Sequence, residues 1–443
     1  MAKNLRAGLR QSIKASRKAS LSGGNVFGSS PLDLRFALQK TLDPRVTFTR
    51  ASTGTFMGSN GLIATAATDA PRFDHNPTTG ESLGLLVEEA RANLLLRSEE
   101  LDNNTAWQRN GATLPTVTAN AGVAPNGTTT ADLWTRSIAT SNFISQATTK
   151  AASTIQYTYS IFVKQAVGNF CALRCQGIYP NKVDVVFNIS SGAIHTPATV
   201  AGGTFTGPSA FITAYPNGWY RLTVTATSDT ATFHECLTSF SSNGVVIDGS
   251  DSVSNSAGFL WGAQLEAGAS PTSYIPTTTA TVTRAADVAS ITGSNFSSWY
   301  NQTEGTVFAE VAVAQPNTGG NQFVFRTSDN TYNNTVAINI PGQAQLSTAS
   351  SGTFDGSANS VANLVANVSA KISAAYATNN LGISLNGATA ITDTSATMPT
   401  GLNRADIGSD HAGFNRVKAG TIKRLTYWPV RLADPTLVSI TQP

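Results

Sequence analysis

Short segments in which apolar and polar residues alternate recur along most of this chain, and turn residues separate them. An alternation with a period of two places the apolar side chains on one face of a β-strand, whereas an amphipathic helix needs a period near 3.6. No helical pattern of convincing length lies between these segments, as a parallel α/β fold would require. The sequence therefore predicts an all-β fold, from segments such as TIQYTYSIFVKQ, KVDVVFNIS, WYRLTVTATS and TVFAEVAVA.

The composition agrees with this prediction. Charged residues make up only 12% of the chain, and 37 glycines accompany many Thr, Ser and Asn residues. Thr fits strands, and Gly and Asn fit the turns between strands. The surface is therefore polar through hydroxyls and amides, which does not favour a helical enzyme with many titrating groups.

The strand signals divide the 443 residues into four parts, a length that fits two or three domains. Residues 1–30 form a basic N-terminal helix and a linker, and residues 31–100 form a β-rich wrapping segment expected to pack against the next domain. Residues 101–284 contain short strands at fairly regular spacing, which indicates an antiparallel jelly-roll β-sandwich. Residues 285–443 form a second sandwich, so the prediction is a tandem of antiparallel β-sandwiches.

The N-terminus differs in charge from the rest of the chain. Residues 1–24 carry six Lys or Arg and no acidic residue, so they contribute +6 to the net charge of +3 and leave −3 on the remainder. Apolar residues recur at every fourth position beside a basic face, which predicts a helix that docks on another protein. A disordered solubilising tail is the main alternative, followed by nucleic-acid binding, membrane-surface binding or organelle targeting. The docking candidates are Leu5, Arg6, Leu9, Arg10, Ile13, Lys14 and Arg17.

The three cysteines are interpreted as free, mostly buried thiols. Cys171 and Cys175 are four residues apart, and a strand would separate their Cα atoms by roughly 13 Å, beyond disulfide reach. A zinc site would want two further clustered ligands, so no metal site is predicted. No apolar run approaches the length of a membrane span, and no signal-peptide core is present, so no membrane insertion is expected.

Catalytic motifs are weak. The stretch GESLG (residues 80–84) matches G-x-S-x-G, but a turn precedes the serine and an apolar strand follows it, the reverse of a nucleophile elbow. The four histidines, His75, His195, His234 and His411, are dispersed and are interpreted as structural. No facing carboxylate pair for glycoside hydrolysis can be chosen from sequence. The prediction is therefore that the protein is not an enzyme.

Several stretches resemble a segment that recurs in structural proteins of tailed bacteriophages. They are FTRASTGTFMGSNGLIATAATDAPRFDHNPTTGESLGLLVEEARANLLLRSEEL, NGTTTADLW, PNGWYRLTVTA and WGAQLEAGASPTSYIPTTTATVTRAAD, which together span roughly residues 45–287. The resemblance implies a tail fibre, adhesin or appendage protein whose central module is similar to carbohydrate-binding jelly rolls. WGAQLE would be the last strand of that module, with Glu266 pointing away from the core, and the Thr-rich remainder would be an extended strap.

The C-terminal part resembles a laminin-G/concanavalin-type lectin sandwich, through LGISLNGA and RADIGSDHAGFNRVKAGTIKRLTYWPVRLAD. That family often uses Ca²⁺ in glycan binding, but no clear acidic cluster is present, so no cofactor is predicted. Trp134, Trp219, Trp261 and Trp428 are expected in the cores. Sugars stack on aromatic faces and bond to polar side chains. The glycan-binding candidates, chosen because they lie beside polar loops or share one loop, are Trp299, Tyr300, Asp410, His411, Phe414 and Asn415.

These expectations combine into a non-enzymatic phage virion structural protein. It would be assembled in the host cytoplasm, dock on other virion proteins by its N-terminus and present lectin-like sandwiches for adhesion to a host-surface glycan. The resemblance also implies a homotrimer, because phage appendages are commonly threefold, and sandwich edge strands can pair between chains. Nucleic acid is not an expected partner. The alternatives are a capsid-decoration or tail-adaptor protein with no receptor role, a capsule polysaccharide depolymerase, and a prophage-derived bacterial adhesin.

Overall fold

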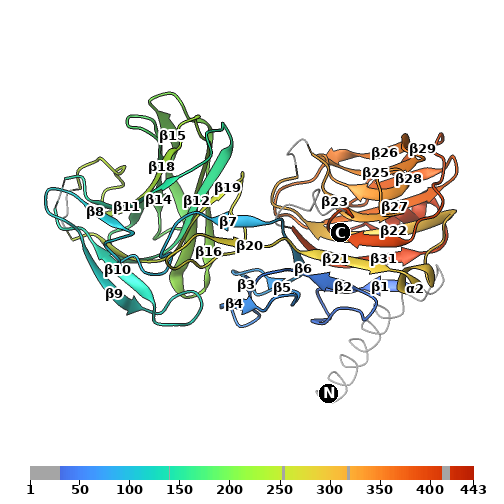
Figure 1. Cartoon of the computed structure of the whole chain (residues 1–443), viewed down its shortest axis with the longest axis horizontal. Coiled ribbons are helices and arrows are strands. Elements are labelled where there is room, and N and C mark those ends of the chain that lie inside the picture. Colours follow the sequence, from blue (N-terminus) through green and yellow to red (C-terminus); the bar gives the residue numbers. More distant parts are fainter. Residues whose placement is uncertain (1–29, 139, 252–254, 317–319, 412–419) are drawn as a thin grey trace, which may run out of the picture.

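The computed structural model describes residues 30–138, 140–251, 255–316, 320–411 and 420–443. It confirms the all-β prediction, because antiparallel sheets dominate and the described α-helices are the short α2 (Ser294–Ser297) and α3 (Asp434–Ile440). The predicted tandem of β-sandwiches is also confirmed: two lobes lie at the ends of the long axis and meet at a narrow waist (Figure 1). In the described residues no helix has the length and apolar character needed to cross a membrane.

The first lobe, here called the central sandwich, consists of two six-stranded sheets. Their strand orders are β16-β17-β12-β19-β10-β9 and β15-β14-β13-β18-β11-β8. Alternate residues of each strand point into one apolar core between the sheets, which accounts for the period of two in the sequence. The strands are β8 (Gln108–Asn110), β9 (Thr116–Gly122), β10 (Ala131–Thr135), β11 (Phe143–Thr149), β12 (Gln156–Val167), β13 (Phe170–Gln176), β14 (Lys182–Asn188), β15 (Ala193–Ala201), β16 (Thr206–Tyr215), β17 (Trp219–Thr227), β18 (Phe233–Ser241) and β19 (Ala257–Ala267).

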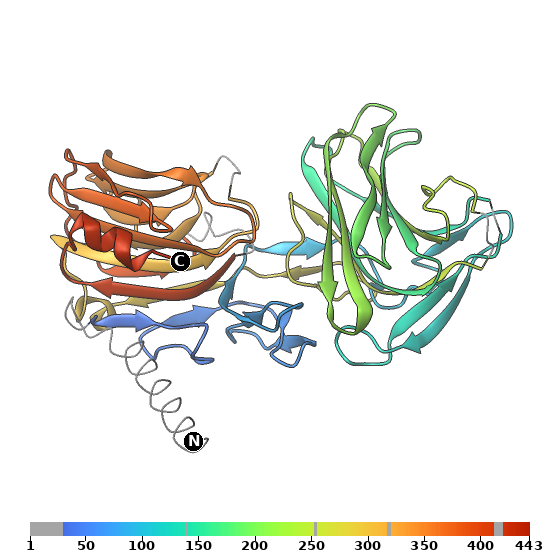
Figure 2. The ribbon, with the colours of Figure 1, turned by 180° about the vertical axis from the view of Figure 1, so that it is seen from behind.

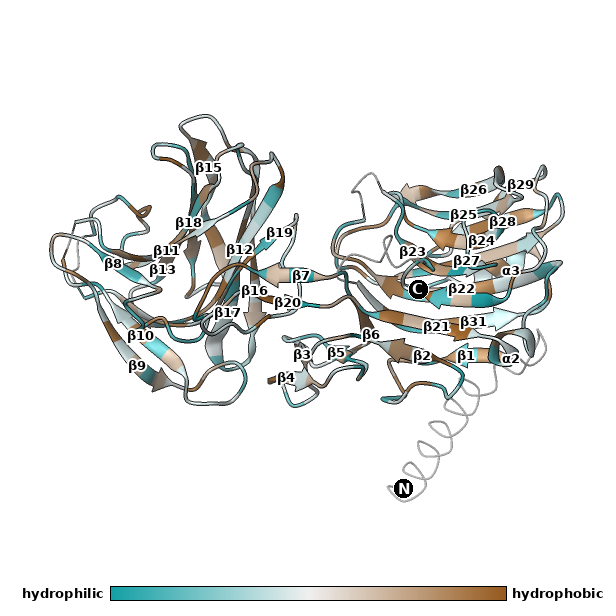
Figure 3. Cartoon of the chain, in the orientation of Figure 1, coloured by the Kyte–Doolittle hydropathy of each residue, from teal (hydrophilic) through white to brown (hydrophobic). Residues whose placement is uncertain are grey.

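The second lobe, the C-terminal sandwich, packs a seven-stranded sheet, β2-β21-β30-β23-β24-β25-β26, against an eight-stranded one. The larger sheet has the order β29-β28-β27-β22-β31-β6-β5, and β1 also pairs with β31. Figure 3 shows apolar residues distributed along the strands of both lobes. The strands from the second half of the chain are β21 (Val288–Thr292), β22 (Glu304–Ala312), β23 (Phe323–Ser328), β24 (Thr335–Asn339), β25 (Gln343–Ser350), β26 (Thr353–Asn363), β27 (Ala370–Ala377), β28 (Leu381–Leu385), β29 (Ile391–Asp393), β30 (Arg404–Ile407) and β31 (Gly420–Trp428).

The N-terminal segment contributes four strands to this C-terminal sandwich. They are β1 (Leu32–Leu34), β2 (Thr47–Thr49), β5 (Phe73–His75) and β6 (Ser82–Val87), which pair with β31, with β21 or with each other. The hairpin of β3 (Gly54–Met57) and β4 (Ile63–Ala66) instead reaches the central sandwich, where the Ile63 N–H donates to the Pro125 carbonyl at 3.0 Å. The N-terminal segment therefore contacts both lobes. Four of its strands join the sheets of the C-terminal sandwich, the lobe that lies farther along the chain (Figures 1 and 2).

Five charged side chains are buried where the chain crosses the waist. Strand β7 (Arg91–Asn93) pairs there with β20 (Val282–Arg284) of the strap. Arg72 reaches Glu88 at 2.7 Å and Asp287 at 2.5 Å, and Asp287 also pairs with Arg50 at 3.1 Å. Every side chain in this group is at most 2% exposed. We call it the waist ion cluster: Arg50, Arg72, Glu88, Arg284 and Asp287.

Candidate functional site

The outer face of one sheet of the central sandwich carries a group of aromatic side chains. Phe162 on β12 points away from the core, and its ring meets the rings of Tyr215, Trp261 and Tyr274 edge to face at centroid distances of 5.0, 5.5 and 6.1 Å. Neighbouring residues of β12, such as Ile161 and Val163, point the other way into the core. Because strands expose alternate residues on opposite faces, the same segment builds both a core and an aromatic outer surface.

This outer face forms one wall of a cavity of about 700 Å³, which we call the aromatic cleft. The edge strand β16 supplies Phe211, Thr213 and Tyr215, which share a face because they lie two residues apart. Phe211 is 59% exposed, so its ring faces solvent. The other walls come from the β3–β6 region, the loop 269–274 and ends of C-terminal sandwich strands; they include Phe56, Asp74, His75, Glu88, Thr272, Ala314, Gln315 and Thr421.

Polar groups stand beside the aromatic rings in this cleft. Asp74 accepts a hydrogen bond from the Met57 N–H at 2.7 Å, and burial raises the pKa of Asp74 to about 6. Arg221 lies with its guanidinium 5.3 Å from the Phe162 ring centroid and donates to the Thr272 carbonyl at 2.8 Å. A carboxylate, a guanidinium and aromatic faces together can bind a ligand that has both apolar surfaces and hydroxyl groups.

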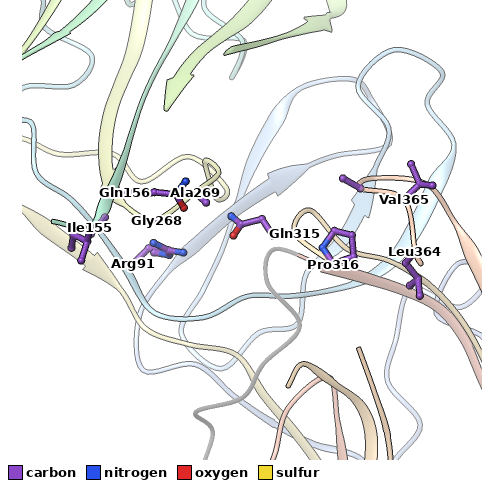
Figure 4. Close-up of a pocket in the computed structure, with 11 residues that line it drawn as sticks. Arg91, Ile155, Gln156, Gly268, Ala269, Gln315, Pro316, Leu364 and Val365 are labelled. Carbon is purple, nitrogen blue, oxygen red and sulfur yellow. The ribbon is translucent and has the colours of Figure 1, made fainter. Parts of the chain in front are cut away.

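A second hollow, of about 960 Å³, adjoins the aromatic cleft and shares the lining residues Ala269, Gln315 and Ala366 with it. Figure 4 shows Arg91, Ile155 and Gln156 on one side, facing Gln315, Pro316, Leu364 and Val365 on the other. The two sides belong to the two lobes, with Ile155 41% and Val365 65% exposed. The waist is therefore bordered by two connected depressions, the kind of inter-domain position at which ligand sites often occur.

Trp299 and Tyr300 do not lie at a surface where a sugar can stack. Trp299 is 4% exposed and Tyr300 9%, and both belong to the core of the C-terminal sandwich. Tyr300 stacks on Phe296 at 4.5 Å and donates to or accepts from Thr327 Oγ1 at 3.0 Å. The sequence interpretation that placed them at a glycan site is corrected, because α2 turns both rings inward, where Tyr376 and Tyr427 pack against them.

Asp410 and His411 lie together shortly after β30 of the C-terminal sandwich, in a polar group that includes Arg326 on β23 and Tyr332. Asp410 is 1% exposed and accepts a hydrogen bond from the Tyr332 hydroxyl at 2.6 Å. His411 Nδ1 lies 2.7 Å from an Arg326 nitrogen, and burial, with Arg326 second, lowers the pKa of His411. Tyr332, which the sequence interpretation missed, is 47% exposed with its ring 4.9 Å from the Arg326 guanidinium.

Other predicted residues are outside the described part of the chain. These are Phe414 and Asn415 of the glycan set, and the docking candidates Leu5, Arg6, Leu9, Arg10, Ile13, Lys14 and Arg17. Ser82 of the GESLG stretch is the first residue of β6 after a turn, as the sequence interpretation had it. His75 lies opposite Ser82 in the strand pairing, but its Nδ1 contacts the Met57 carbonyl at 3.0 Å.

Metal-ligating side chains gather at one place among the described residues. Cys175, His234 and Cys236 bring their ligand atoms within 4.8 Å of one another, in the core of the central sandwich. Cys171, Cys175 and Cys236 are all free and buried, as expected from the sequence. Spacing along the chain did not reveal the group, because strand pairing brings Cys175 to the other two residues.

No family model matches this chain, and no curated protein matches its sequence. Similar solved structures include the CBM40 of the Ruminococcus gnavus IT-sialidase bound to α2,3-sialyllactose, with 15% identity, a TM-score of 0.29, and coverage of 33% of this chain and 87% of that chain. Domain 4 of AbnA, a GH43 extracellular arabinanase from Geobacillus stearothermophilus in complex with arabinotriose, has 13% identity, a TM-score of 0.29 and coverage of 40% and 82%. The K499G mutant of the NanB sialidase from Streptococcus pneumoniae has 16% identity, a TM-score of 0.28 and coverage of 34% and 26%. These partial similarities identify neither a family nor a ligand for this chain.

Proposed function

We propose that this chain is a non-enzymatic glycan-binding protein and that the aromatic cleft is where the sugar binds. The observation that carries the proposal is the row of Phe211, Thr213 and Tyr215 on β16, with Asp74 and Arg221 beside it. The apolar faces of sugar rings stack on aromatic rings, and sugar hydroxyls bond to carboxylates and guanidinium groups. The distance from Phe211 to Tyr215 along the strand is roughly 13 Å, which suits an oligosaccharide better than a single sugar.

The environment of the cleft carboxylates supports a binding role rather than hydrolysis. Hydrolysis of a glycosidic bond generally uses two carboxyl groups that flank the bond, one of them able to give a proton. Glu88 is 1% exposed, pairs with Arg72 at 2.7 Å and accepts from the Ser273 hydroxyl at 2.7 Å. Burial by itself would raise the pKa of Glu88, but the positive charges of Arg284 and Arg72 have the larger effect and lower it to about 2. Both oxygens of Glu88 already accept hydrogen bonds from Arg72 and Ser273, so Glu88 is not free to attack a sugar or to activate a water molecule beside Asp74.

The biological setting is also part of the proposal. The resemblance of residues 45–287 to tailed-phage structural proteins and the basic N-terminal stretch support a virion appendage that docks by residues 1–24. In that setting the glycan is one on the host surface, and a homotrimer would present several clefts together. A capsid-decoration or tail-adaptor protein with no receptor role would share the fold but would not bind a host glycan.

Replacing Phe211 with alanine is expected to weaken binding of the full chain to the host polysaccharide about tenfold, because a central aromatic contact commonly supplies more than about 1.4 kcal/mol of binding free energy. Phe354→Ala is the matched control, since Phe354 is 60% exposed, as Phe211 is, but lies on β26 and not in the cleft. Titration calorimetry with polysaccharide fragments measures both variants against the unchanged chain, with an assay for released reducing ends alongside.

Three outcomes would contradict the proposal in different ways. Equal affinity of the Phe211→Ala variant and the unchanged chain would remove the cleft as the binding site. Release of reducing ends would make the protein a depolymerase. Absence of binding to any host glycan would favour the decoration or adaptor role.

A further inference from the structure

The core of the central sandwich contains a histidine beside two cysteines that lie opposite each other on paired strands. Cys175 on β13 lies directly opposite Cys236 on β18 in the antiparallel register. His234 precedes Cys236 by two residues, so its side chain emerges on the same face of β18. All three side chains therefore point into the core, where the two thiol sulfurs and an imidazole nitrogen lie within 4.8 Å of one another.

The surroundings of His234 do not satisfy its polar atoms. His234 is 1% exposed, and neither ring nitrogen has a hydrogen-bond partner among the described residues. Its ring packs against Tyr157, with a centroid distance of 5.5 Å, and Phe205, with 6.1 Å. A buried polar group without a partner is costly, and buried polar side chains are nearly always bonded. A metal ion bound by the two neighbouring thiols could also bind a ring nitrogen of His234 and so give that nitrogen a partner.

We propose that Cys175, His234 and Cys236 form a site for a single Zn²⁺ ion in the core of the central sandwich. Cysteine sulfur and histidine nitrogen are the ligands that zinc prefers. Around Zn²⁺, with bonds near 2.3 Å to sulfur and 2.0–2.1 Å to nitrogen, ligand atoms lie roughly 3.5–3.8 Å apart. The ligand atoms of Cys175, His234 and Cys236 all lie within 4.8 Å of one another, close enough for one ion to bind all three.

Charge favours Zn²⁺ over a monovalent ion. Two thiolates and a neutral imidazole carry two negative charges, which one divalent cation cancels, so the loaded site is neutral within an apolar core. Cu⁺ would leave one negative charge uncompensated there. The three side chains leave one tetrahedral position for a small ligand, as in other sites with three protein ligands.

Cys171 provides an internal comparison. It is also free and fully buried on β13, four residues from Cys175, but it lies opposite Phe240 and belongs to no group of metal-ligating side chains among the described residues. Its environment raises the pKa of the Cys171 thiol through burial alone. Cys171 therefore serves as a buried cysteine that only packs in the core. Cys175 and Cys236, by contrast, both lie beside His234, which could bind the same metal ion.

The full chain, produced in zinc-supplemented medium and purified without chelators, is expected to contain about one zinc per chain by plasma mass spectrometry. Cobalt-grown protein should show the near-ultraviolet charge-transfer absorption of thiolate-bound Co²⁺. Cys175→Ser and Cys236→Ser should each lose the bound metal and the absorption, and the matched control Cys171→Ser should keep both.

A measurement on the unchanged chain covers the case in which a serine variant does not fold. Stepwise titration with a mercurial reagent should release zinc in proportion to the thiols that react, as followed by a chromogenic chelator. Three results would overturn the site: no metal in the unchanged chain grown in zinc or cobalt, a Cys175–Cys236 disulfide seen as a loss of two hydrogen masses, or equal metal content in all three serine variants.

Discussion

Replacing Asp287 with alanine is expected to lower the free energy of unfolding by about 3–5 kcal/mol, since it removes one partner from a buried ion network. Asp287 contacts Arg72 at 2.5 Å and Arg50 at 3.1 Å, and it accepts the Glu88 N–H at 2.8 Å. These side chains are essentially unexposed, so water cannot replace the lost carboxylate. Urea unfolding of the full chain, followed by tryptophan fluorescence, measures the change.

Glu100→Ala is the control for this prediction. Glu100 pairs with Arg97 at 2.5 Å, as closely as Asp287 pairs with Arg72, but the two side chains are 43% and 30% exposed. Exposed pairs contribute about 0–1 kcal/mol, so Glu100→Ala should change the free energy of unfolding by less than 1 kcal/mol. A similar loss in both variants would mean that the waist ion cluster does not stabilise the fold through its burial.

The same cluster should make the fold sensitive to acid. The pKa of Glu88 is lowered from 4.5 to about 2, so its contribution is fully present above pH 4.5 and is lost as the pH falls through about 2. The shift corresponds to about 3 kcal/mol at neutral pH. The unchanged chain should therefore exceed a Glu88→Gln variant in free energy of unfolding by less and less as the pH falls from 4.5 to about 2. A difference that does not depend on pH would contradict a stabilising role for the Glu88 charge.

Replacing Trp299 with alanine is expected to destabilise the C-terminal sandwich by about 3–5 kcal/mol, because removal of a buried aromatic side chain leaves a cavity. Trp299 packs edge to face on Phe296 and Tyr427, and its indole N–H donates to the Asn295 carbonyl at 2.6 Å. Thermal unfolding of the full chain measures the effect. Tyr332→Ala is the comparison, because Tyr332 is 47% exposed and should cost much less.

The sequence interpretation had assigned Trp299 to glycan binding, and this variant separates the two roles. If Trp299 is structural, its replacement with alanine lowers the unfolding temperature. The affinity of the remaining folded protein for glycan is then unchanged. If the Trp299→Ala variant kept its stability but lost its affinity for glycan, Trp299 would belong to the binding site. That result would contradict its position in the core.

The fold class was predictable because the relevant signal is local. Alternation with a period of two in segments such as residues 156–167 and 219–227 identifies strands whatever their partners. The partners of the N-terminal strands were not predictable in this way. Leu32 pairs with Tyr427 and Thr47 with Ser290, and nothing in the short segments LDL and TFT specifies contacts so far along the chain.

Glu266 illustrates how a local prediction can be incomplete. It lies on the outer face of β19, away from the sandwich core, as expected from the alternation. However, it is fully buried, because the loop that follows folds back and Thr272 donates to it from its N–H at 2.9 Å and from its hydroxyl. Sequence pattern shows which way a side chain points from its own strand, but it does not show what later covers that face.

The candidate sites were missed for the same reason. The aromatic cleft combines Phe211 and Arg221 with Asp74, which is more than 130 residues earlier in the chain. The proposed zinc site joins Cys175 to His234 and Cys236 only through strand pairing. The HEC spacing at residues 234–236 was the available local signal, since it places a histidine and a cysteine on one face of a strand.

Hydrogen exchange of the full chain, with and without a saturating host polysaccharide fragment, tests the location of glycan binding most directly. Binding in the aromatic cleft predicts slower exchange in β16 (Thr206–Tyr215) and in residues 269–274, which border the cleft. Slower exchange confined to the group around Tyr332 and Asp410, which does not line the aromatic cleft, would place the ligand elsewhere on the C-terminal sandwich and would contradict binding in the cleft.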